Sequence, residues 1–389
     1  MKLTQLTHHD LDGYGAATVV AARADVDRVV HVARYSDVGP VVAAELHRLA
    51  KTGGPETLLM TDLGLEPVAV SFIKDFVELN GRRAADRHHR LIVLDHHASS
   101  LEQLAAQGLL PTETAIPAWP GLKTIATGDE SVTVMIDDGR CATRLADDHH
   151  DLYATRQADP AIVAALATLV EAVDAVDLWK KDRPIFSQAQ VLDEVFWDNV
   201  SNFVPLGHPL HDRFVGDLLL GMAERLGTGA TPAAIEREAG TLRARIVDGL
   251  LQGQPGDDAD QTTRMRIAKL LARSPDLFAR LSGGAKLAFG LDGGMFQRVS
   301  DAIMVGGDAK LVINVGRSGS LSFRSNDGSA LDAAQKFRGG GHRDAAGGRL
   351  TSGAVTSLTD AVAQVSPVLH PPEPDPASSP FAALRGLKV

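Results

Sequence analysis

Residues 3–13 read LTQLTHHDLDG, a mostly apolar run that passes directly into histidines and aspartates. Two later segments repeat this order, LLMTDLG at 58–64 and LIVLDHH at 91–97. Each apolar run is typical of a buried β-strand. The carboxyl ends of parallel strands meet at one rim of a sheet, where α/β proteins bind their ligands. We therefore expect the acids and imidazoles of the three segments to lie together.

The first 185 residues alternate between strand and helix patterns, which predicts a parallel, doubly wound sheet and an α/β fold class. The expected strands are Leu3–Thr7, Val29–Ala33, Leu58–Met60, Leu91–Leu94 and Val132–Ile136. The expected helices are Gly13–Ala24, Val41–Lys51, Glu66–Leu79 and Ala161–Val176.

The remainder of the chain divides into three parts by pattern. Residues 186–282 indicate a helical connector, with helices expected at Ala233–Leu251 and Arg264–Leu281. Residues 283–366 indicate a second, smaller α/β domain, and residues 367–389 a proline-rich, extended tail. The strands expected in the second domain are Lys286–Phe289, Lys310–Val315 and Leu321–Arg324. The predicted domains are thus 1–185, 186–282 and 283–366, followed by the tail.

Length and charge limit the kinds of ligand that this chain is expected to bind. The chain has 389 residues and a formal net charge of -10, and such acidity argues against a protein that tracks long duplex nucleic acid, whose phosphates call for a basic surface. A short oligonucleotide or a nucleotide fits better. The single cysteine allows no intrachain disulfide, and no apolar run is long enough to span a membrane. A cytoplasmic protein is expected, and a homodimer is compatible with the chain.

The segment His8–Gly13 supplies three candidate metal ligands, His8, Asp10 and Asp12. Carboxylates and imidazoles that converge in this way suit a pair of divalent cations. Either aspartate could instead cap the following helix, a common role for this residue. One cap accounts for one aspartate but not for the histidine and both aspartates. Gly13 is expected to allow a sharp turn into the helix.

Histidine pairs occur at four places, so a pair alone means little. His8-His9 and His96-His97 each end an apolar strand pattern, and Asp95 precedes the second pair. The pairs at His88-His89 and His149-His150 lie in polar stretches, and we expect both to be solvated. His96 and His97 therefore join the candidate site.

Two further aspartates complete the candidate set. Asp62 ends a strand between the other two motifs, where its carboxylate could bridge two metals, although an aspartate there is commonly a turn residue. Asp177 follows the apolar helix and would be the fourth carboxylate, with Asp174 as its competitor. Either could instead pair with Lys180 or Lys181. The whole constellation points to metal-assisted hydrolysis of a phosphate ester.

A glycine run marks the second domain at Gly339, Gly340 and Gly341, followed by His342. A loop with so little side-chain bulk lets backbone N–H groups approach a phosphate. Residues 317–349 hold six basic side chains against three acidic ones, a local excess of +3 in an acidic chain. This segment is therefore a candidate anion-binding surface.

Taken in order along the chain, these motifs resemble those of the DHH phosphoesterase superfamily, whose name describes Asp95-His96-His97. The resemblance extends to a C-terminal DHH-associated domain with its Gly-Gly-Gly-His motif at 339–342. The segments at 7–13, 137–140 and 177–179 look most like the oligoribonuclease (nanoRNase) branch. His9 departs from that branch, which often has a smaller amide there.

The resemblance implies roles for individual residues. His8, Asp10 and Asp62 would hold one metal ion, manganese or alternatively magnesium or zinc. The second ion would be held by Asp12, Asp62, His96 and Asp177. Asp95 would orient the site and His97 would face the substrate. Arg324, Gly340, Gly341 and His342 would grip the substrate phosphate across an interdomain cleft.

The resemblance also implies an activity, a manganese-dependent exonuclease that degrades short oligoribonucleotides to mononucleotides. A phosphatase of pAp and a phosphodiesterase of cyclic or linear dinucleotides are the alternatives within the same reaction class. A non-catalytic nucleotide-binding regulator is the alternative from another class.

Overall fold

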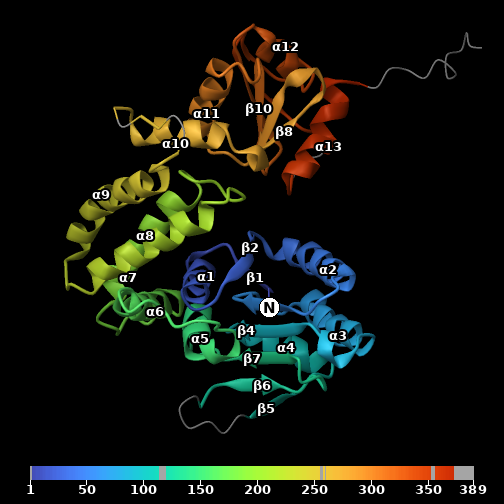
Figure 1. Ribbon diagram of the computed structural model, residues 1–389, viewed down its shortest axis with the longest axis vertical. Coiled ribbons are helices and arrows are strands. Elements are labelled where there is room, and N and C mark those ends of the chain that lie inside the picture. Colours follow the sequence, from blue (N-terminus) through green and yellow to red (C-terminus); the bar gives the residue numbers. More distant parts are fainter. Residues whose placement is uncertain (1, 114–119, 255–256, 259, 352–354, 372–389) are drawn as a thin grey trace, which may run out of the picture. The chain divides into compact units, whose positions relative to one another are not determined.

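The computed structural model describes residues 2–113, 120–254, 257–258, 260–351 and 355–371 (Figure 1). The chain separates into two compact units. The first comprises Met1–Asn199 with Asp212–Ile246, and the second comprises Val200–His211 with Val247–Val389. The fold is mixed α/β with one sheet in each unit, as the sequence predicted.

The first unit is built on a seven-stranded sheet with the order β2-β1-β3-β4-β7-β6-β5. The five strands from β2 to β7 in this order are parallel, and β6 and β5 run antiparallel at one edge. The strands are β1 (Lys2–His8), β2 (Val26–Val32), β3 (Glu56–Thr61), β4 (Arg90–Asp95), β5 (Pro111–Glu113), β6 (Lys123–Ile125) and β7 (Val132–Ile136).

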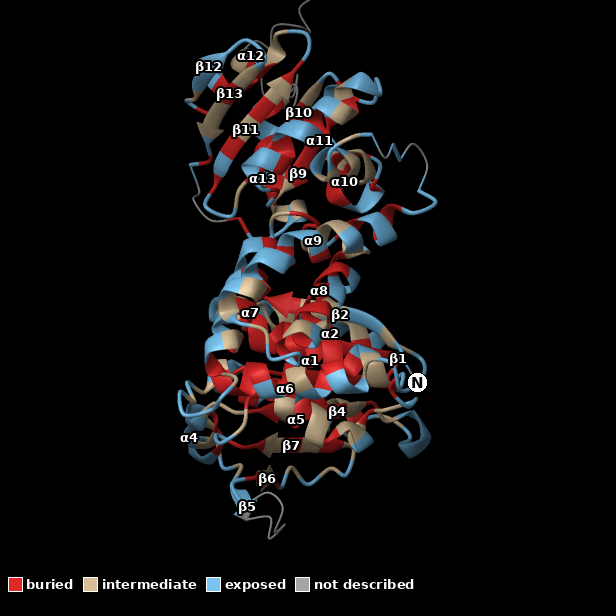
Figure 2. Cartoon of the chain, turned by 90° about the vertical axis from the view of Figure 1, so that its left-hand side faces the viewer, coloured by how far each residue is buried: buried red, intermediate tan, exposed pale blue. Residues whose placement is uncertain are grey.

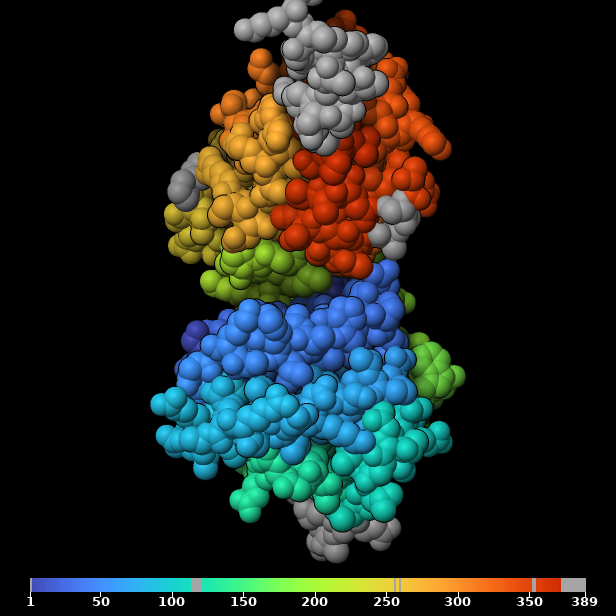
Figure 3. Space-filling model, turned by 90° about the vertical axis from the view of Figure 1, so that its right-hand side faces the viewer, coloured from blue at the N-terminus to red at the C-terminus, as the bar shows by residue number. Residues whose placement is uncertain are grey.

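Helices cover both faces of this sheet, which is why its central strands β1, β3 and β4 are buried over nearly their whole length (Figure 2). On one face pack α2 (Tyr35–Lys51), α3 (Pro67–Gly81) and α4 (Ala98–Ala106). On the other pack α1 (Leu11–Arg23), α5 (Ala142–Asp148) and α6 (Val163–Asp177). The parallel, doubly wound arrangement is therefore confirmed. Figure 3 shows α2 and α3 side by side on the surface.

Three further helices follow in sequence: α7 (Phe186–Val200), α8 (His211–Leu226) and α9 (Pro232–Leu251). They lie in the stretch where a helical connector was expected. The chain passes between the two compact units three times, after Asn199, after His211 and, within α9, after Ile246. Short 3-10 turns occur at Ala85–Arg87, His150–Leu152, Pro275–Leu277 and Ser282–Gly284.

The second unit has a six-stranded sheet with the order β12-β13-β11-β10-β9-β8. Only β9 and β10 pair in parallel; the other neighbours are antiparallel. The strands are β8 (Phe278–Arg280), β9 (Lys286–Phe289), β10 (Leu311–Val315), β11 (Ser320–Ser325), β12 (Gly340–His342) and β13 (Ala345–Arg349). The helices are α10 (Thr263–Ala272), α11 (Gly293–Val305), α12 (Ser329–Gln335) and α13 (Leu358–Leu369).

Two expectations for this region are wrong. The helix expected over Arg264–Leu281 ends at Ala272, because the chain turns at Ser274-Pro275 and continues as strand β8. The tail expected from residue 367 begins later, since α13 continues through Pro367 to Leu369 with buried Val365 and Leu369 facing the core. The rest of that tail, 372–389, lies outside the described residues.

None of the helices in the described part of the chain combines the length and the apolar character needed to cross a membrane.

Candidate metal centre

The register of the sheet brings the ends of three strands together. Thr7 of β1 lies opposite Thr61 of β3, and Thr61 lies opposite Leu94 of β4. The residues that follow these three, which are His8, Asp62 and Asp95, therefore emerge at one edge. Below them the Thr61 hydroxyl donates to the Thr7 hydroxyl at 2.9 Å.

Two groups of side chains at this edge have the composition of a metal site. One contains His8, Asp10 and Asp62, and the other contains Asp12, His96 and Asp177; within each, the potential ligand atoms lie within 4.8 Å of one another. A third group of this kind joins Asp62, His96 and His97. All six residues expected from the sequence as metal ligands are thus brought together.

Asp62 lies between the two groups. Its Oδ1 is 3.2 Å from Nε2 of His96, and its Oδ2 is 4.0 Å from Nδ1 of His8. Its backbone φ is 55°, a left-handed conformation that is uncommon for residues other than glycine. Such conformations concentrate at functional sites, where the surrounding structure enforces them.

Asp10 caps the following helix and also lies in the first of these groups. Its Oδ1 accepts the Gly13 backbone N–H at 3.0 Å and so caps α1, while its Oδ2 lies 2.5 Å from Nδ1 of His8. Burial opposes the charge of Asp10, but the hydrogen bonds with His8 and Asp62, the charge of His8 and the Gly13 N–H together outweigh it and lower the pKa of Asp10 to about 2. A cap and a place in the cluster are therefore compatible.

Asp12 is fixed by a different helix. Its two carboxylate oxygens accept the backbone N–H groups of Ala142 (2.7 Å) and Thr143 (2.8 Å) at the start of α5. Its Oδ2 also lies 3.6 Å from Nε2 of His96. Each carboxylate oxygen has a second lone pair, so these bonds leave Asp12 able to bind a cation.

Gly13 is required for a reason other than the sharp turn expected from the sequence. It lies inside α1, and a Cβ on it would come within 2.1 Å of the carbonyl oxygen of His8. Only glycine lets the first turn of α1 pack this closely on the end of β1.

The structure separates Asp177 from its competitor Asp174. Oδ2 of Asp177 lies 3.7 Å from Nδ1 of His96. Asp174 instead accepts from the Lys180 ammonium at 2.7 Å, from the Cys141 backbone N–H at 3.1 Å, and pairs with Arg144 at 3.2 Å. Asp177 is therefore the aspartate placed beside His96.

Asp95 supports a histidine and does not belong to any of the three groups. It is fully buried, and its Oδ1 lies 2.7 Å from Nδ1 of His97 while its Oδ2 accepts the Ser100 hydroxyl. The hydrogen bond with Asp95 raises the pKa of His97 against the opposing effect of burial. His97 is thus oriented, and its positive form favoured, by a side chain beneath it.

The cluster carries more negative charge than its side chains neutralise. Burial, reinforced by the charges of Asp12 and Asp10, raises the pKa of Asp62 well above its usual value. The same causes raise the pKa of Asp177 to about 8. Oδ2 of Asp62 is buried and accepts no hydrogen bond. Burying a carboxylate oxygen without a hydrogen-bond donor costs free energy, and nearby carboxylates raise that cost. A cation bound at this place would offset it, so the residues fit a metal ion.

Sequence reasoning missed Tyr35, which comes from the start of α2. Its hydroxyl lies 3.1 Å from Nε2 of His97, and its ring stacks on His8 with a centroid distance of 5.3 Å. Burial, followed by the charges of Asp62 and Asp10, raises the pKa of Tyr35 to about 12. The phenol therefore stays protonated at the edge of the cluster.

In each of the two histidine pairs expected to be solvated, one member is buried, while His88 and His150 are partly exposed. His89 is fully buried, with Nδ1 accepting the Glu56 backbone N–H at 3.1 Å and Nε2 donating to the Leu49 carbonyl at 3.1 Å. His149 is also buried. Both sit where the chain packs against the core, so polar neighbours in the sequence did not imply exposure.

In the second unit, the glycine run is part of an edge strand and not the loop that was expected. Gly340 lies opposite Gly347 of β13, and His342 lies opposite Ala345. Ala345 also lies opposite Arg324 of β11. Directly opposed residues share a face of a sheet, so His342 and Arg324 lie on the same face.

The three glycines differ in whether the strand leaves room for a Cβ atom. A Cβ on Gly339 would come within 2.0 Å of the Gly347 carbonyl oxygen, and Gly341 has a φ of +141° with backbone atoms of Ala345 and Ala346 at 2.7 Å from a Cβ. Gly340 has no atom within 4 Å of a Cβ. Packing therefore explains Gly339 and Gly341 but not Gly340.

Comparison with known proteins gives one relative and one structure of note. No family model matches the chain. A protein of Helicobacter pylori named 3',5'-cyclic-nucleotide phosphodiesterase is 21% identical over 366 residues, which cover 90% of this chain and 93% of the relative. The crystal structure of an uncharacterized protein from Helicobacter pylori G27 aligns with a TM-score of 0.67 at 20% identity, over 95% of this chain and 99% of that one.

The second of these likenesses supports the mixed α/β fold described above. A crystal structure of RecJ in complex with Mn2+ from Thermus thermophilus also aligns, at 17% identity over 95% of this chain and 52% of that chain, but its TM-score of 0.25 supports no inference about this protein.

Proposed function

We propose that this protein is a metal-dependent phosphodiesterase of the DHH type that acts on small nucleotides. The observation that carries the proposal is the convergence of His8, Asp10, Asp12, Asp62, His96 and Asp177 at the end of one sheet. The Helicobacter pylori relative named as a phosphodiesterase, similar over nearly its whole length, supports the same reaction class.

The residues present fit a pair of divalent ions. His8, Asp10 and Asp62 would hold one ion, and Asp12, Asp62, His96 and Asp177 the other, with Asp62 shared. Oxygen and imidazole donors of this kind suit manganese, and magnesium is the alternative. When bound, such ions supply a nucleophilic water near neutral pH and offset charge on the phosphoryl oxygens.

The chain's own residues would position and neutralise the phosphate. Asp95 accepts the Nδ1–H of His97 and so directs Nε2 of that ring outward, towards the Tyr35 hydroxyl. A positively charged His97 would offset charge on the phosphoryl group or on the leaving oxygen. Tyr35, which keeps its proton, would add a second hydrogen-bond donor at the same place.

In the second unit, Arg324, Gly339, Gly340, Gly341 and His342 would bind a substrate phosphate. The guanidinium of Arg324 lies over the ring of Phe296 at 5.8 Å, which limits its freedom. Gly340 and His342 are exposed on the edge strand. The exposed backbone of β12 and the basic side chains of Arg324 and His342 on one face of the sheet could donate hydrogen bonds to a phosphate group.

Short oligoribonucleotides are the first candidate substrate, in keeping with the sequence resemblance to the nanoRNase branch and with the acidic charge of the chain. The Helicobacter pylori relative favours a second candidate, a 3',5'-cyclic nucleotide. Both contain a phosphodiester bond, so the same metal centre would serve either.

The testing experiment is hydrolysis by metal-stripped protein, with and without added Mn2+ or Mg2+. The substrates are an RNA dinucleotide, pAp, 3',5'-cyclic AMP and a cyclic dinucleotide. We expect metal-dependent release of mononucleotides, fastest from the RNA dinucleotide. Faster hydrolysis of cyclic AMP would select the second candidate. If the metal-loaded protein cleaves none of the four, the proposal is wrong and the hypothesis of a non-catalytic regulator replaces it.

A further inference from the structure

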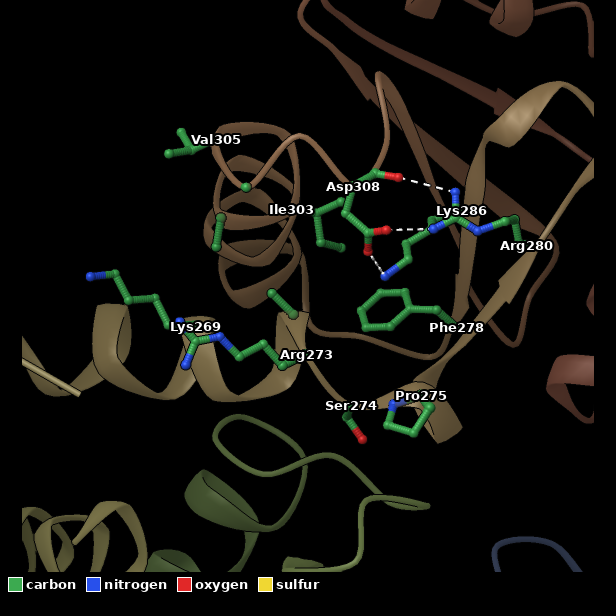
Figure 4. A pocket seen from close by; sticks show the side chains of 13 residues that line it. Lys269, Arg273, Ser274, Pro275, Phe278, Arg280, Lys286, Ile303, Val305 and Asp308 are labelled. Atoms are coloured by element: carbon green, nitrogen blue, oxygen red, sulfur yellow. Dashed lines mark hydrogen bonds and ion pairs between the residues drawn. The ribbon is translucent and has the colours of Figure 1, made fainter. Parts of the chain in front are cut away.

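A cavity of about 700 Å³ lies in the second unit, and none of the residues assigned above lines it. It is lined by α10, β8, β9 and the end of α11 (Figure 4). Strand β8 is one edge of the sheet and β12, which carries His342, is the opposite edge. The volume falls in the range of small-molecule sites, roughly 300–1,000 Å³.

The charge of the lining is strongly positive for so acidic a chain. Lys269, Arg273, Arg280 and Lys286 line the cavity together with one carboxylate, that of Asp308. Arg280 and Lys286 both pair with Asp308, and Arg280 also donates to its carbonyl oxygen at 3.1 Å. Among the lining residues, one carboxylate and four cations give a formal excess of three positive charges, and Lys269 also interacts with the carboxylate of Asp257 outside the lining. Such an excess attracts an anion.

The same cavity has an apolar wall. Phe278 and Ile303 are buried, whereas Val305 is 82% exposed and stands at the end of α11. The Lys286 ammonium lies 5.1 Å from the centroid of the Phe278 ring, so the aromatic face and a cation adjoin (Figure 4). An apolar surface beside fixed cations is the combination that a ligand with a flat apolar body and an anionic group requires.

We propose that this cavity binds a nucleoside phosphate, with the phosphate towards Lys269 and Arg273 and the base or sugar against the apolar wall. The ligand could be a free mononucleotide or the phosphorylated end of an oligonucleotide, which share this chemistry. The site shares no residue with the metal centre. Its occupation is therefore independent of whether the metal centre hydrolyses the substrates named above.

The test is calorimetric titration of the full chain with AMP, adenosine, inorganic phosphate and the 5'-phosphorylated dinucleotide pApA. The titrations are run in the wild type and in Asp62→Asn, where the metal centre is disabled. We expect AMP to bind in both proteins, and adenosine to bind at least about tenfold more weakly, since it lacks the phosphate that would accept charge-assisted hydrogen bonds. Tighter binding of pApA than of AMP would identify an oligonucleotide end as the occupant.

Two variants on the Asp62→Asn background locate the binding. Lys269→Ala combined with Arg273→Ala should weaken AMP binding at least about tenfold, and Val305→Asp, at an exposed position, should also weaken it by placing a negative charge at the rim. Arg298→Ala is the matched control, since it is on α11 but does not line the cavity, and it should leave binding unchanged. Unaltered binding in the first two variants, or loss of AMP binding on Asp62→Asn alone, would overturn the proposal.

Discussion

Strand β4 has a histidine pair at each end, and the two pairs have opposite environments. At its amino end, His89 is enclosed, and its two ring nitrogens bond the backbone of Glu56 and Leu49. At its carboxyl end, His96 and His97 face Asp62, Asp177 and Asp95. The comparison shows that the direction of a parallel strand, and not the residue type, separates a structural histidine from a candidate ligand.

The sharpest way to break this comparison is Asp62→Asn at the carboxyl end. We expect the rate of phosphodiester hydrolysis to fall by about a thousandfold or more, because bound ions contribute several kcal/mol to the transition state. The metal-free variant should also melt about 2–4 °C higher, since it removes a buried charge that Asp10 and Asp12 repel. Steady-state kinetics and thermal melting measure the two effects.

The matched control for that variant is Asp174→Asn, one α-helical turn from Asp177. Asp174 is buried but pairs with Lys180 and Arg144, so its loss should lower the melting temperature and leave the rate within a few fold. Equal loss of activity in both variants would contradict the assignment of Asp62 to a metal centre.

An intermediate effect is expected for Asp95→Asn, which weakens the support of His97 without touching the proposed ligands. Outer partners of this kind typically contribute about 10–100-fold to activity, and we expect a fall of that size in kcat/KM. Ser100→Ala removes one hydrogen bond to Asp95 and should cost less. A fall in Asp95→Asn as complete as that of Asp62→Asn would place Asp95 among the metal ligands instead.

The smallest effect on activity is expected at the amino end, for His89→Phe. Two hydrogen bonds are lost in the interior, so the free energy of unfolding should fall by about 1–3 kcal/mol at pH 7.5, with kcat/KM unchanged. Chemical denaturation measures the first quantity. A loss of activity in a folded variant would show that the two ends of β4 are coupled.

The same variant should change the pH dependence of stability. Burial, followed by the charge of Arg83, lowers the pKa of His89 below 6.5 in the folded protein. The unfolded chain therefore binds the proton first as the pH falls below 6.5, and folding stability declines there. The stability that the neutral His89 ring contributes is fully present above the pKa that this histidine has in the unfolded chain, and it is lost as the pH falls towards the pKa in the folded protein. His89→Phe should flatten the decline between pH 7 and pH 5 in denaturation curves.

Much of the first unit could be predicted because its signals are local. Apolar runs that end in His8, Asp62 and Asp95 mark parallel strands directly, and the short strand Val132–Ile136 is found with the bounds expected. The parallel sheet then brings these candidate ligands together without further information. The roles of individual residues in metal binding stay predictions.

What could not be predicted depends on contacts distant in sequence or on weak strand formers. Tyr35 lies in α2 before Gly39-Pro40, a pair that usually interrupts a helix, and the helix was expected only from Val41. The strand β13 has the sequence AAGGR, whose residues have little β-propensity. The sequence therefore predicted neither this strand nor its pairing with the glycine run. The ring of His89 is buried and forms hydrogen bonds with the backbone of Glu56 and Leu49. These residues are distant in sequence, so no local pattern predicts the contacts.

The order β1-β3-β4 within the sheet has a consequence for the kinetics of folding. The candidate ligands come from the ends of three adjacent strands and from the end of α6, so the complete set exists only after those strands have paired. An ion bound by the full set therefore stabilises the native state more than the transition state for folding. Added Mn2+ would then slow unfolding while leaving the refolding rate nearly unchanged. A bound ion would therefore lengthen the lifetime of the folded state.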